Sequence, residues 1–355
     1  MTNSIHVTLA LPLADELLEQ LRTVDSRLSF TALTAAQRRS YRGGRPLWGG
    51  YGDAPASDEE SAEEAAAALA PILQRTEVLL CNPIVPEDLI ERASGLRWLQ
   101  LSSAGIDRLA DTPIARSELT ITTASGIHAA TISEYVIGMM IAFAKRLPDA
   151  IRSQSESAWR PYWPAELEGQ TVGIVGAGNI GARVGLVAKA MGMRVLGIRR
   201  SVERRTTGEE AGEPHVDELL PPGDLHYLLR ESDYVVLGTP LTAETRGMIG
   251  ADELALMKPS SVIVNIARGA VIDEQALIAA LKEKRIAGAG LDVFSQEPLP
   301  PESELWGLEN VIMTPHISGG TPRYMERVVG LFCDNLKRYA AGDNLVNVVD
   351  PERGY

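Results

Sequence analysis

The sequence predicts an α/β protein built on parallel sheets that are wound with helices on both faces. Short apolar segments alternate with helical patterns along most of the chain, which is typical of strand–helix–strand units. A glycine-rich turn of the kind that joins a strand to a helix occurs at 176–181. The length of 355 residues exceeds one ordinary domain of roughly 100–200 residues, so we expect two domains.

The expected strands are short, apolar and separated by turn residues. They fall at 78–81, 97–101, 119–122, 171–175, 194–198, 234–237, 262–265, 288–293 and 311–313, and helical patterns stand at 15–21, 86–93, 133–146 and 180–191. The acidic, Ala-rich stretch at 58–70 also predicts a helix, with Ser57 or Asp58 as its N-cap. Residues 40–57, rich in Gly, Pro and aromatic residues, read as a loop whose role is open.

The helix expected at 133–146 is apolar on nearly all sides, so it should be buried. We predict that it forms the interface of a homodimer, with burial inside one subunit as the alternative. The longest apolar stretch, 135–144, falls short of the roughly 20 residues of a membrane helix. We therefore expect no membrane partner.

The net charge of −13 argues against nucleic-acid or anionic-membrane binding, because both require a basic surface. Cys81 and Cys333 lie in no metal-binding cluster and read as small buried hydrophobic residues. No metal site is predicted. The N-terminus lacks the pattern of a signal peptide, so a cytoplasmic location is the expectation.

Residues 171–181 read TVGIVGAGNIG and contain a Gly-x-Gly-x-x-Gly motif between a predicted strand and a predicted helix. In this context the motif is typical of a dinucleotide site. Gly176 permits the tight turn, Gly178 lets the backbone approach the pyrophosphate, and Gly181 allows close helix–strand packing. Ile180 begins the expected helix, whose N–H groups would bind the anion, and Asn179 directly precedes it; both are expected to bind the cofactor.

The acidic residue that usually follows the second strand of a dinucleotide-binding unit is missing. Arg199, Arg200 and Ser201 stand there instead. Two guanidinium groups and a hydroxyl would bind a 2′-phosphate, whereas an acid would repel it. We therefore expect NADP(H) to be preferred, with NAD(H) possible.

Three chemically active side chains follow later strands. Arg268 comes after the strand at 262–265, Glu297 after the strand at 288–293, and His316 after the strand at 311–313. Ligands of an open parallel sheet bind beyond the carboxyl ends of its strands, so all three should lie on the edge that also carries the glycine motif.

These side chains suit hydride transfer to a 2-oxo acid. The oxyanion that forms at the carbonyl needs a proton, which a histidine can supply. A neighbouring carboxylate would orient the imidazole and favour its protonated form. An arginine would hold the substrate carboxylate and stabilise charge on the carbonyl oxygen.

The chain resembles the D-isomer-specific 2-hydroxyacid dehydrogenase family from about residue 78 to its end. The resemblance rests on segments at 172–181, 240–247 (PLTAETRG), 265–273 (NIARGAVID), 290–298 and 314–319 (TPHISG). It implies a catalytic triad of Arg268, Glu297 and His316.

The resemblance also implies contacts with the bound molecules. Asp292 would contact the nicotinamide carboxamide, and the cofactor would also be lined by Thr239, Pro240, Thr245, Ile266, Ala267 and Gly319. The backbone amides of Ser103, Ala104 and Gly105 would share the substrate carboxylate with Arg268.

In the family the substrate domain is discontinuous and flavodoxin-like, and a cleft separates it from a Rossmann cofactor domain. For this chain the resemblance implies a substrate domain of 1–125 with 318–355, and a cofactor domain of 126–317. A structural contact is expected of His128, and a buried pairing of Glu134.

The leading hypothesis is an NADPH-linked reductase of glyoxylate, hydroxypyruvate or an aryl pyruvate. A phosphite dehydrogenase would keep the triad but favour NAD. A nucleotide-sensing, corepressor-like binding protein on the same fold is the alternative of another class. Glu297 argues against formate oxidation, since members that oxidise formate carry glutamine at this position.

Overall fold

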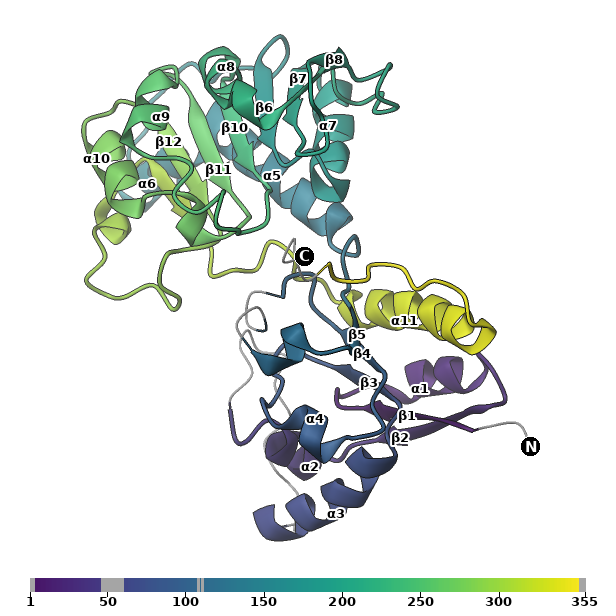
Figure 1. The fold of residues 1–355 in the computed structure, drawn as a ribbon. Coiled ribbons are helices and arrows are strands. Elements are labelled where there is room, and N and C mark those ends of the chain that lie inside the picture. The colour runs from purple at the N-terminus through teal and green to yellow at the C-terminus, as the bar shows by residue number, and fades with distance from the viewer. Residues whose placement is uncertain (1–3, 46–60, 107–108, 110–111, 351–355) are drawn as a thin grey trace. The chain divides into compact units, whose positions relative to one another are not determined.

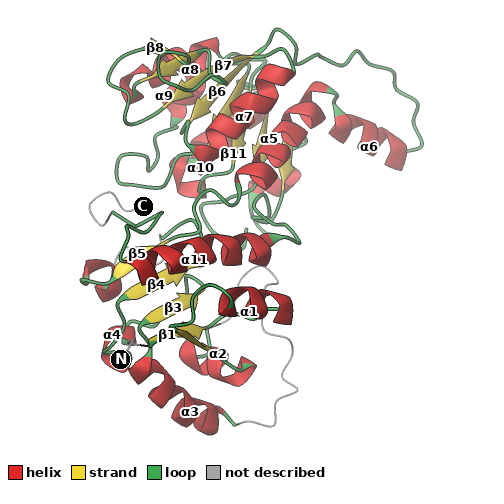
Figure 2. Ribbon diagram, turned by 90° about the vertical axis from the view of Figure 1, so that its right-hand side faces the viewer, coloured by secondary structure: helices red, strands yellow, loops and turns green. Residues whose placement is uncertain are grey.

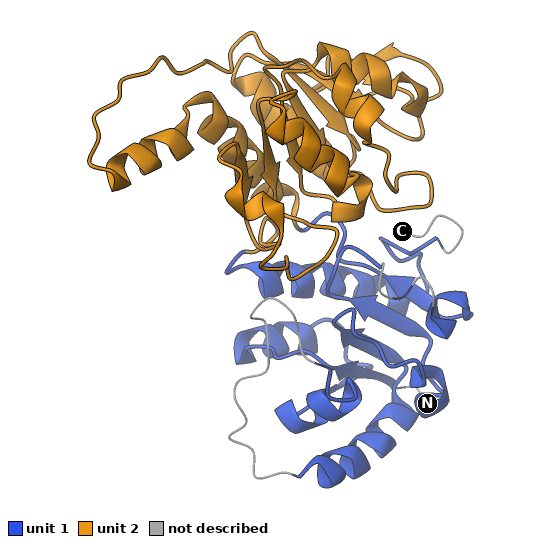
Figure 3. Cartoon of the chain, turned by 90° about the vertical axis from the view of Figure 1, so that its left-hand side faces the viewer, with its two compact units in different colours: residues 1–127, 321–355 blue, residues 128–320 orange. Residues whose placement is uncertain are grey.

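The computed structural model of the chain describes residues 4–45, 61–106, 109 and 112–350. The chain divides into two compact units (Figure 3). Unit 1 comprises residues 1–127 and 321–355, and unit 2 comprises residues 128–320. Unit 2 is therefore inserted into unit 1, and each unit contains its own sheet.

The sheet of unit 1 has the strand order β2-β1-β3-β4-β5, and all of its pairs are parallel. This is the order of flavodoxin-like folds. The strands are β1 (Ile5–Leu9), β2 (Leu28–Ala32), β3 (Val78–Cys81), β4 (Trp98–Leu101) and β5 (Thr120–Thr122). The helices are α1 (Asp15–Arg22), α2 (Ala35–Tyr41), α3 (Ala62–Arg75), α4 (Leu89–Arg92) and α11 (Tyr324–Ala341).

Helices cover both faces of this sheet (Figure 1). One core joins apolar side chains of α2, α3 and α4 to the sheet. The other joins α1 and α11 to the opposite face, where Trp98 lies 5.2 Å from the Phe332 ring. The last helix of the chain thus completes the core of the unit that begins at the N-terminus.

The sheet of unit 2 has the order β13-β12-β11-β10-β6-β7-β9-β8, which is parallel except for β8. Apart from its edge strands this is a Rossmann sheet. The strands are β6 (Thr171–Val175), β7 (Arg194–Ile198), β8 (Thr206–Thr207), β9 (Glu218–Leu220), β10 (Tyr234–Leu237), β11 (Val262–Asn265), β12 (Gly288–Leu291) and β13 (Val311–Met313). The helices are α5 (Ala129–Ala144), α6 (Leu147–Ser155), α7 (Asn179–Ala190), α8 (Leu225–Glu231), α9 (Ala251–Leu256) and α10 (Glu274–Lys282).

Helices also cover both faces of the second sheet. Side chains of α5 and α7 form one core with it, and those of α8, α9 and α10 form the other. Both units are therefore doubly wound α/β domains, which confirms the fold class predicted from the alternation of strands and helices.

Some element boundaries differ from the prediction. The N-cap of α3 is Ser61, not Ser57 or Asp58, because Ser61 and Glu64 form a capping box in which each side chain bonds the other's backbone. The segment at 86–93 contains only the single turn of α4. Tyr41, expected in a loop, ends α2 and is fully buried, and residues 46–57 of that stretch lie outside the described residues.

The apolar helix expected at 133–146 is α5, which runs from Ala129 to Ala144. Packing inside unit 2 explains much of its composition, since Val136 and Met140 are fully buried against α7 and the sheet. The buried pairing expected of Glu134 is not found among the described residues of the single chain. Glu134 is exposed, on the same face of the helix as Gly138, and forms no ion pair with another described residue.

Candidate active site

The glycine turn follows β6 and opens α7. Gly176 has a φ of +103°, and a Cβ there would lie 2.7 Å from the backbone of Gly238 and Thr239 after β10. A Cβ at Gly181 would lie 2.6 Å from the Gly176 carbonyl oxygen. A Cβ at the exposed Gly178 would meet no atom within 4 Å. The first and third glycines are thus required by packing, and the second leaves room for a ligand.

This geometry fits a dinucleotide. The turn leaves the end of β6, which lies between β10 and β7 in the sheet. Later strands are added on the β7 side first and then on the β10 side, so the strand order reverses at β6. Ligands of Rossmann sheets bind at that point, with the pyrophosphate on the helix N-terminus. Gly178, Asn179 and Ile180 would hold the pyrophosphate, and Asn179 is exposed at the first turn of α7.

The residues expected to read the ribose leave β7 beside this turn. The Ile198 carbonyl accepts hydrogen bonds from the amides of Gly176 and Ala177 at 3.1 and 2.8 Å. Arg199 follows directly, and its Nη1 lies 2.5 Å from Oε1 of Glu213. Arg200 and Ser201 are exposed. Sequence reasoning missed Glu213, because no motif signals an ion pair between the end of β7 and the loop that joins β8 to β9.

The other residues expected around the cofactor lie at the ends of β10 and β11. Thr239 and Pro240 follow β10, and the Thr245 hydroxyl fixes their turn by donating to the Pro240 carbonyl at 2.7 Å. Ile266 and Ala267 follow β11 and are buried.

Asn265, which the sequence reasoning also missed, shapes the turn that carries Arg268. Its Oδ1 accepts from the Ala267 amide at 3.1 Å, and its Nδ2 donates to the Arg268 carbonyl at 3.0 Å. The Arg268 side chain donates from Nη1 to the Ala267 carbonyl at 2.7 Å. A buried amide side chain therefore sets the path of the backbone at the candidate catalytic arginine.

Glu297 and His316 form a direct pair. His316 Nδ1 lies 2.9 Å from Oε2 of Glu297, and Oε1 accepts from the Phe294 amide at 3.0 Å. Burial raises the pKa of Glu297, but the hydrogen bonds from His316 and Phe294 and the charges of His316 and Arg268 outweigh it, so the pKa lies below its usual value. Glu297 is therefore a carboxylate at neutral pH, oriented by one backbone bond toward the imidazole.

Asp292 holds the loop that presents His316. The Asp292 carboxylate is fully buried and accepts from the Thr314 hydroxyl at 2.6 Å and from the amides of Ile317 and Ser318 at 2.8 and 2.9 Å. The Asp292 carbonyl accepts from the His316 amide at 2.8 Å. His316 itself has a φ of 54°, in the left-handed region that this clamp maintains.

The contact of Asp292 with the nicotinamide stays a prediction. What the structure shows is an anchor beneath the histidine loop. Gly319 lies at the end of that loop, where its carbonyl is 3.2 Å from Nδ1 of His128. His128 thus makes a local contact within unit 2.

The predicted substrate loop lies in unit 1, directly after β4. The Ser102 amide donates to the Cys81 carbonyl at 2.8 Å, and the Ser102 carbonyl accepts from the Tyr324 hydroxyl at 2.6 Å. The amides of Ser103, Ala104 and Gly105 donate no hydrogen bond to another described residue. Three adjacent backbone donors at a strand end suit an anion such as a carboxylate.

Comparisons with known proteins identify the family of the chain. The model of the "D-isomer specific 2-hydroxyacid dehydrogenase, NAD binding domain" matches residues 137–318. The chain belongs to the D-isomer specific 2-hydroxyacid dehydrogenase family. It is thus a 2-hydroxyacid dehydrogenase that uses a nicotinamide cofactor.

Individual relatives cover most of the chain. A glyoxylate reductase of Korarchaeum cryptofilum is 37% identical over 280 residues, which are 77% of this chain and 82% of the relative. A family member from Xanthobacter autotrophicus Py2, solved with NADPH and MES, is 26% identical with a TM-score of 0.78 and covers 99% of this chain and 100% of its own. A family member from Aeromonas salmonicida is 27% identical, also with a TM-score of 0.78, and covers 98% of this chain and 99% of its own.

The lowered pKa of Glu297 leads to a stability prediction. Glu297→Gln should lower the melting temperature at neutral pH by roughly 1–3 °C, the effect of a partly exposed ion pair. Because the folded-state pKa lies below the usual 4.5, this contribution is present in full above about pH 4.5 and is lost as the pH falls through the lowered pKa. Thermal melts of both proteins from about pH 8 to about pH 3 measure it.

The control for this experiment is Glu302→Gln, which removes an exposed carboxylate from the following segment. Its melting temperature should follow that of the wild type at every pH. We assign the stabilising effect to the ionised carboxylate of Glu297. A difference in melting temperature between wild type and Glu297→Gln that stays constant as the pH falls below the pKa of Glu297 would contradict this assignment.

Proposed function

We propose that the protein is an NADPH-linked reductase of small 2-oxo acids, with glyoxylate, hydroxypyruvate or an aryl pyruvate as the substrate type. The observation that carries this proposal is the His316–Glu297 pair, at 2.9 Å, in the unit that contains the glycine turn. The charge of Arg268 acts on the same carboxylate. The name of the Korarchaeum relative supports glyoxylate within this class.

The proposed mechanism uses each of these side chains once. The reduced nicotinamide, when bound, supplies a hydride to the carbonyl carbon of the 2-oxo acid. His316, oriented through Nδ1 by Glu297, gives the proton from Nε2 to the carbonyl oxygen. Arg268 holds the substrate carboxylate and stabilises negative charge on that oxygen. The product is a 2-hydroxy acid.

Each unit has a separate part in this proposal. Unit 2 would bind the cofactor through the glycine turn and the ends of β7, β10 and β11, whereas unit 1 would receive the substrate carboxylate at Ser103–Gly105. The cleft expected between the two domains stays a prediction. Cys81 and Cys333 are free, buried thiols, which supports the proposed cytoplasmic location.

A panel of 2-oxo acids, each assayed with NADPH and with NADH, tests the proposed function. We expect turnover of at least one member with loss of the reduced cofactor and formation of the D-2-hydroxy acid. Oxidation of phosphite with NAD, and no turnover in the panel, would favour a phosphite dehydrogenase. Nucleotide binding without any turnover would favour a corepressor-like binding protein.

Homodimer formation also stays a prediction. Several large apolar side chains are exposed in the segment after α5, where Ile151 is 66% exposed and Trp159 and Trp163 are 94% and 96% exposed. Figure 2 shows that α6 and the extended segment after it stand away from the rest of this unit. Such a large apolar surface is unusual for a monomer, which supports a second copy of the chain as its cover.

Light scattering tests this prediction by measuring the molecular mass in solution. At micromolar concentration we expect the mass of two chains, and Trp159→Ser with Trp163→Ser should shift the mass toward one chain because burial of two indoles is lost. Replacing the 57% exposed Trp306 by serine is the matched control and should leave the mass unchanged. A stable, active wild-type monomer would contradict the prediction.

A further inference from the structure

The hairpin β8–β9 brings a carboxylate to the end of β7. The nucleotide motif lacks an acid at this point of the sequence, but Glu213 in the hairpin pairs with Arg199 at 2.5 Å. We propose that Glu213 sets the preference between NADPH and NADH by competing with the 2′-phosphate for Arg199. This inference rests on the proposed function, because it takes the nucleotide to bind at the glycine turn.

The hairpin loop is packed tightly, so Glu213 is held in place. A Cβ at Gly208 would lie 2.4 Å from the Glu213 carbonyl oxygen, and a Cβ at Gly185 of α7 would lie 2.7 Å from the His215 carbonyl oxygen. The Glu213 amide donates to the Gly208 carbonyl at 2.7 Å. Because these contacts involve the backbone, a substitution of the Glu213 side chain should leave the conformation of the loop unchanged.

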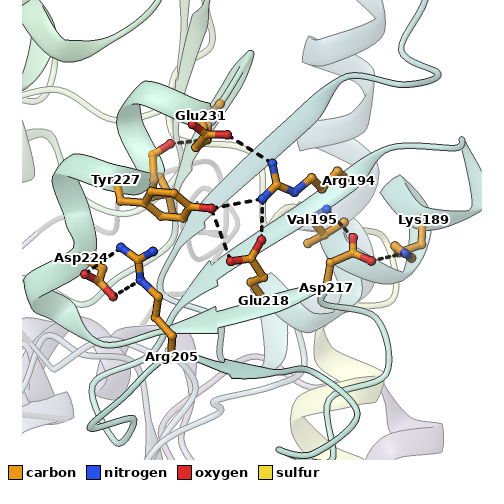
Figure 4. Close-up of polar contacts among 11 residues, drawn as sticks. Lys189, Arg194, Val195, Arg205, Asp217, Glu218, Asp224, Tyr227 and Glu231 are labelled. Carbon is orange, nitrogen blue, oxygen red and sulfur yellow. Dashed lines mark hydrogen bonds and ion pairs between the residues drawn. The ribbon is translucent and has the colours of Figure 1, made fainter.

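Ion pairs anchor the β9 strand of the hairpin to its neighbours (Figure 4). Glu218 pairs with Arg194 of β7, and Asp217 pairs with Lys189 of α7 at 2.5 Å. The second oxygen of Asp217 accepts from the Val195 amide at 2.8 Å. The hairpin is therefore tied to α7, which the nucleotide motif opens, and to β7, the strand that Arg199 follows.

A second set of contacts anchors the start of the hairpin. Arg205 bonds both oxygens of Asp224, at 2.7 and 3.1 Å, and its guanidinium lies 3.9 Å from the centre of the Tyr227 ring. These contacts join the residue before β8 to the start of α8. Both ends of the segment that carries Glu213 are thus fixed to the sheet and its helices.

The carboxylate of Glu213 offsets the positive charge that Arg199 would offer to a 2′-phosphate. Arg199 and Glu213 together carry no net charge, so a 2′-phosphate with nearly two negative charges must displace or repel the carboxylate. A ribose hydroxyl can instead donate a hydrogen bond to it, as in sites that bind NAD. Glu213 should therefore weaken NADPH binding more than NADH binding and narrow the preference that Arg199 and Arg200 create.

Equilibrium titration of Glu213→Gln with NADPH and NADH, followed by cofactor fluorescence, tests the inference. We expect the ratio of the two Kd values to shift toward NADPH by about 3- to 10-fold, since a partly exposed charge pair is weakened and a repulsive charge is lost. Adenosine 2′,5′-bisphosphate and AMP, titrated by calorimetry, should show the same shift, because they differ only in the 2′-phosphate. Glu213→Ala is a second variant with the same expectation.

The matched control is Glu210→Gln, which makes the same charge change in the same hairpin. Glu210 bonds the Thr206 hydroxyl at 2.8 Å and does not contact Arg199. The ratio of its Kd values for NADPH and NADH should stay within about 2-fold of the wild-type ratio, because solvent and salt screen the effect of an exposed charge. An equal shift in this control would overturn the inference, because a general change of charge would then explain the result.

Arg199→Ala provides the decisive comparison. If Glu213 acts through Arg199, the effect of Glu213→Gln should fall below about 2-fold in the Arg199→Ala background. A full effect in that background, or an unchanged or reduced NADPH preference in Glu213→Gln, would overturn the inference. These binding readouts are independent of turnover, so an inactive wild type that binds both nucleotides would overturn only the proposed function.

Discussion

Replacing His316 by asparagine should lower kcat for 2-oxo acid reduction by about 100-fold or more, because the proton donor is lost while the oxyanion still forms. Asparagine is suited to this test, since it tolerates the left-handed conformation of His316, where φ is 54°. The Asp292 clamp bonds mainly the backbone of the loop and should keep its shape. Stopped-flow or steady-state kinetics measure kcat, and fluorescence titration should show nearly unchanged cofactor binding.

A matched control exists in the same unit. His226 also pairs with a glutamate, with Nε2 lying 3.3 Å from Oε1 of Glu253 on the surface of unit 2. His226→Asn should keep the wild-type kcat. Near-normal kcat in His316→Asn would refute the assignment of His316 as the general acid.

The second large effect concerns the ribose end of the cofactor. Replacing Arg199 and Arg200 together by alanine should raise KM for NADPH by about 10- to 150-fold, since a charged hydrogen bond contributes about 1.5 to 3 kcal/mol. KM for NADH should change only slightly. The difference should shrink at high salt, because Arg199 is partly exposed and screening weakens its attraction for the phosphate.

Arg204→Ala is the control for this pair, since Arg204 is exposed in the turn that follows. Its KM values for both cofactors should match those of the wild type. The reading of Arg199 and Arg200 as phosphate-binding residues fails if the wild type uses both cofactors with equal kcat/KM. It also fails if the double variant keeps the wild-type ratio.

The sequence predicted best the strands that are buried on both faces. β10 and residues 262–264 of β11 are continuous apolar runs, because helices cover both sides of their sheet. β1 escaped prediction because Thr8, although 2% exposed, is polar and satisfies its hydroxyl with that of Thr76 at 2.7 Å. The edge strand β2 is only half-buried, so its pattern is weak.

The same distinction applies to the candidate site. Residues that follow a strand, such as Arg268 and His316, could be placed on one edge of the sheet from the order of strands alone. Glu213 and Asn265 could not, because their roles depend on how a hairpin and a turn fold back on the backbone. The contacts of Asp292 depend likewise on the path of the histidine loop, which no local pattern encodes.

The insertion of unit 2 into unit 1 determines the order in which the two units can fold during synthesis. The sheet of unit 1 needs α11 to cover one face, where Val329, Phe332 and Leu336 are fully buried. The ribosome makes these residues only after all of unit 2. The N-terminal strands must therefore wait with one apolar face covered only by α1 while unit 2 folds, which reverses the usual order in which the first domain made is the first completed. Chaperone dependence should accordingly be greatest for nascent chains that end between the last residue of unit 2 and the end of α11.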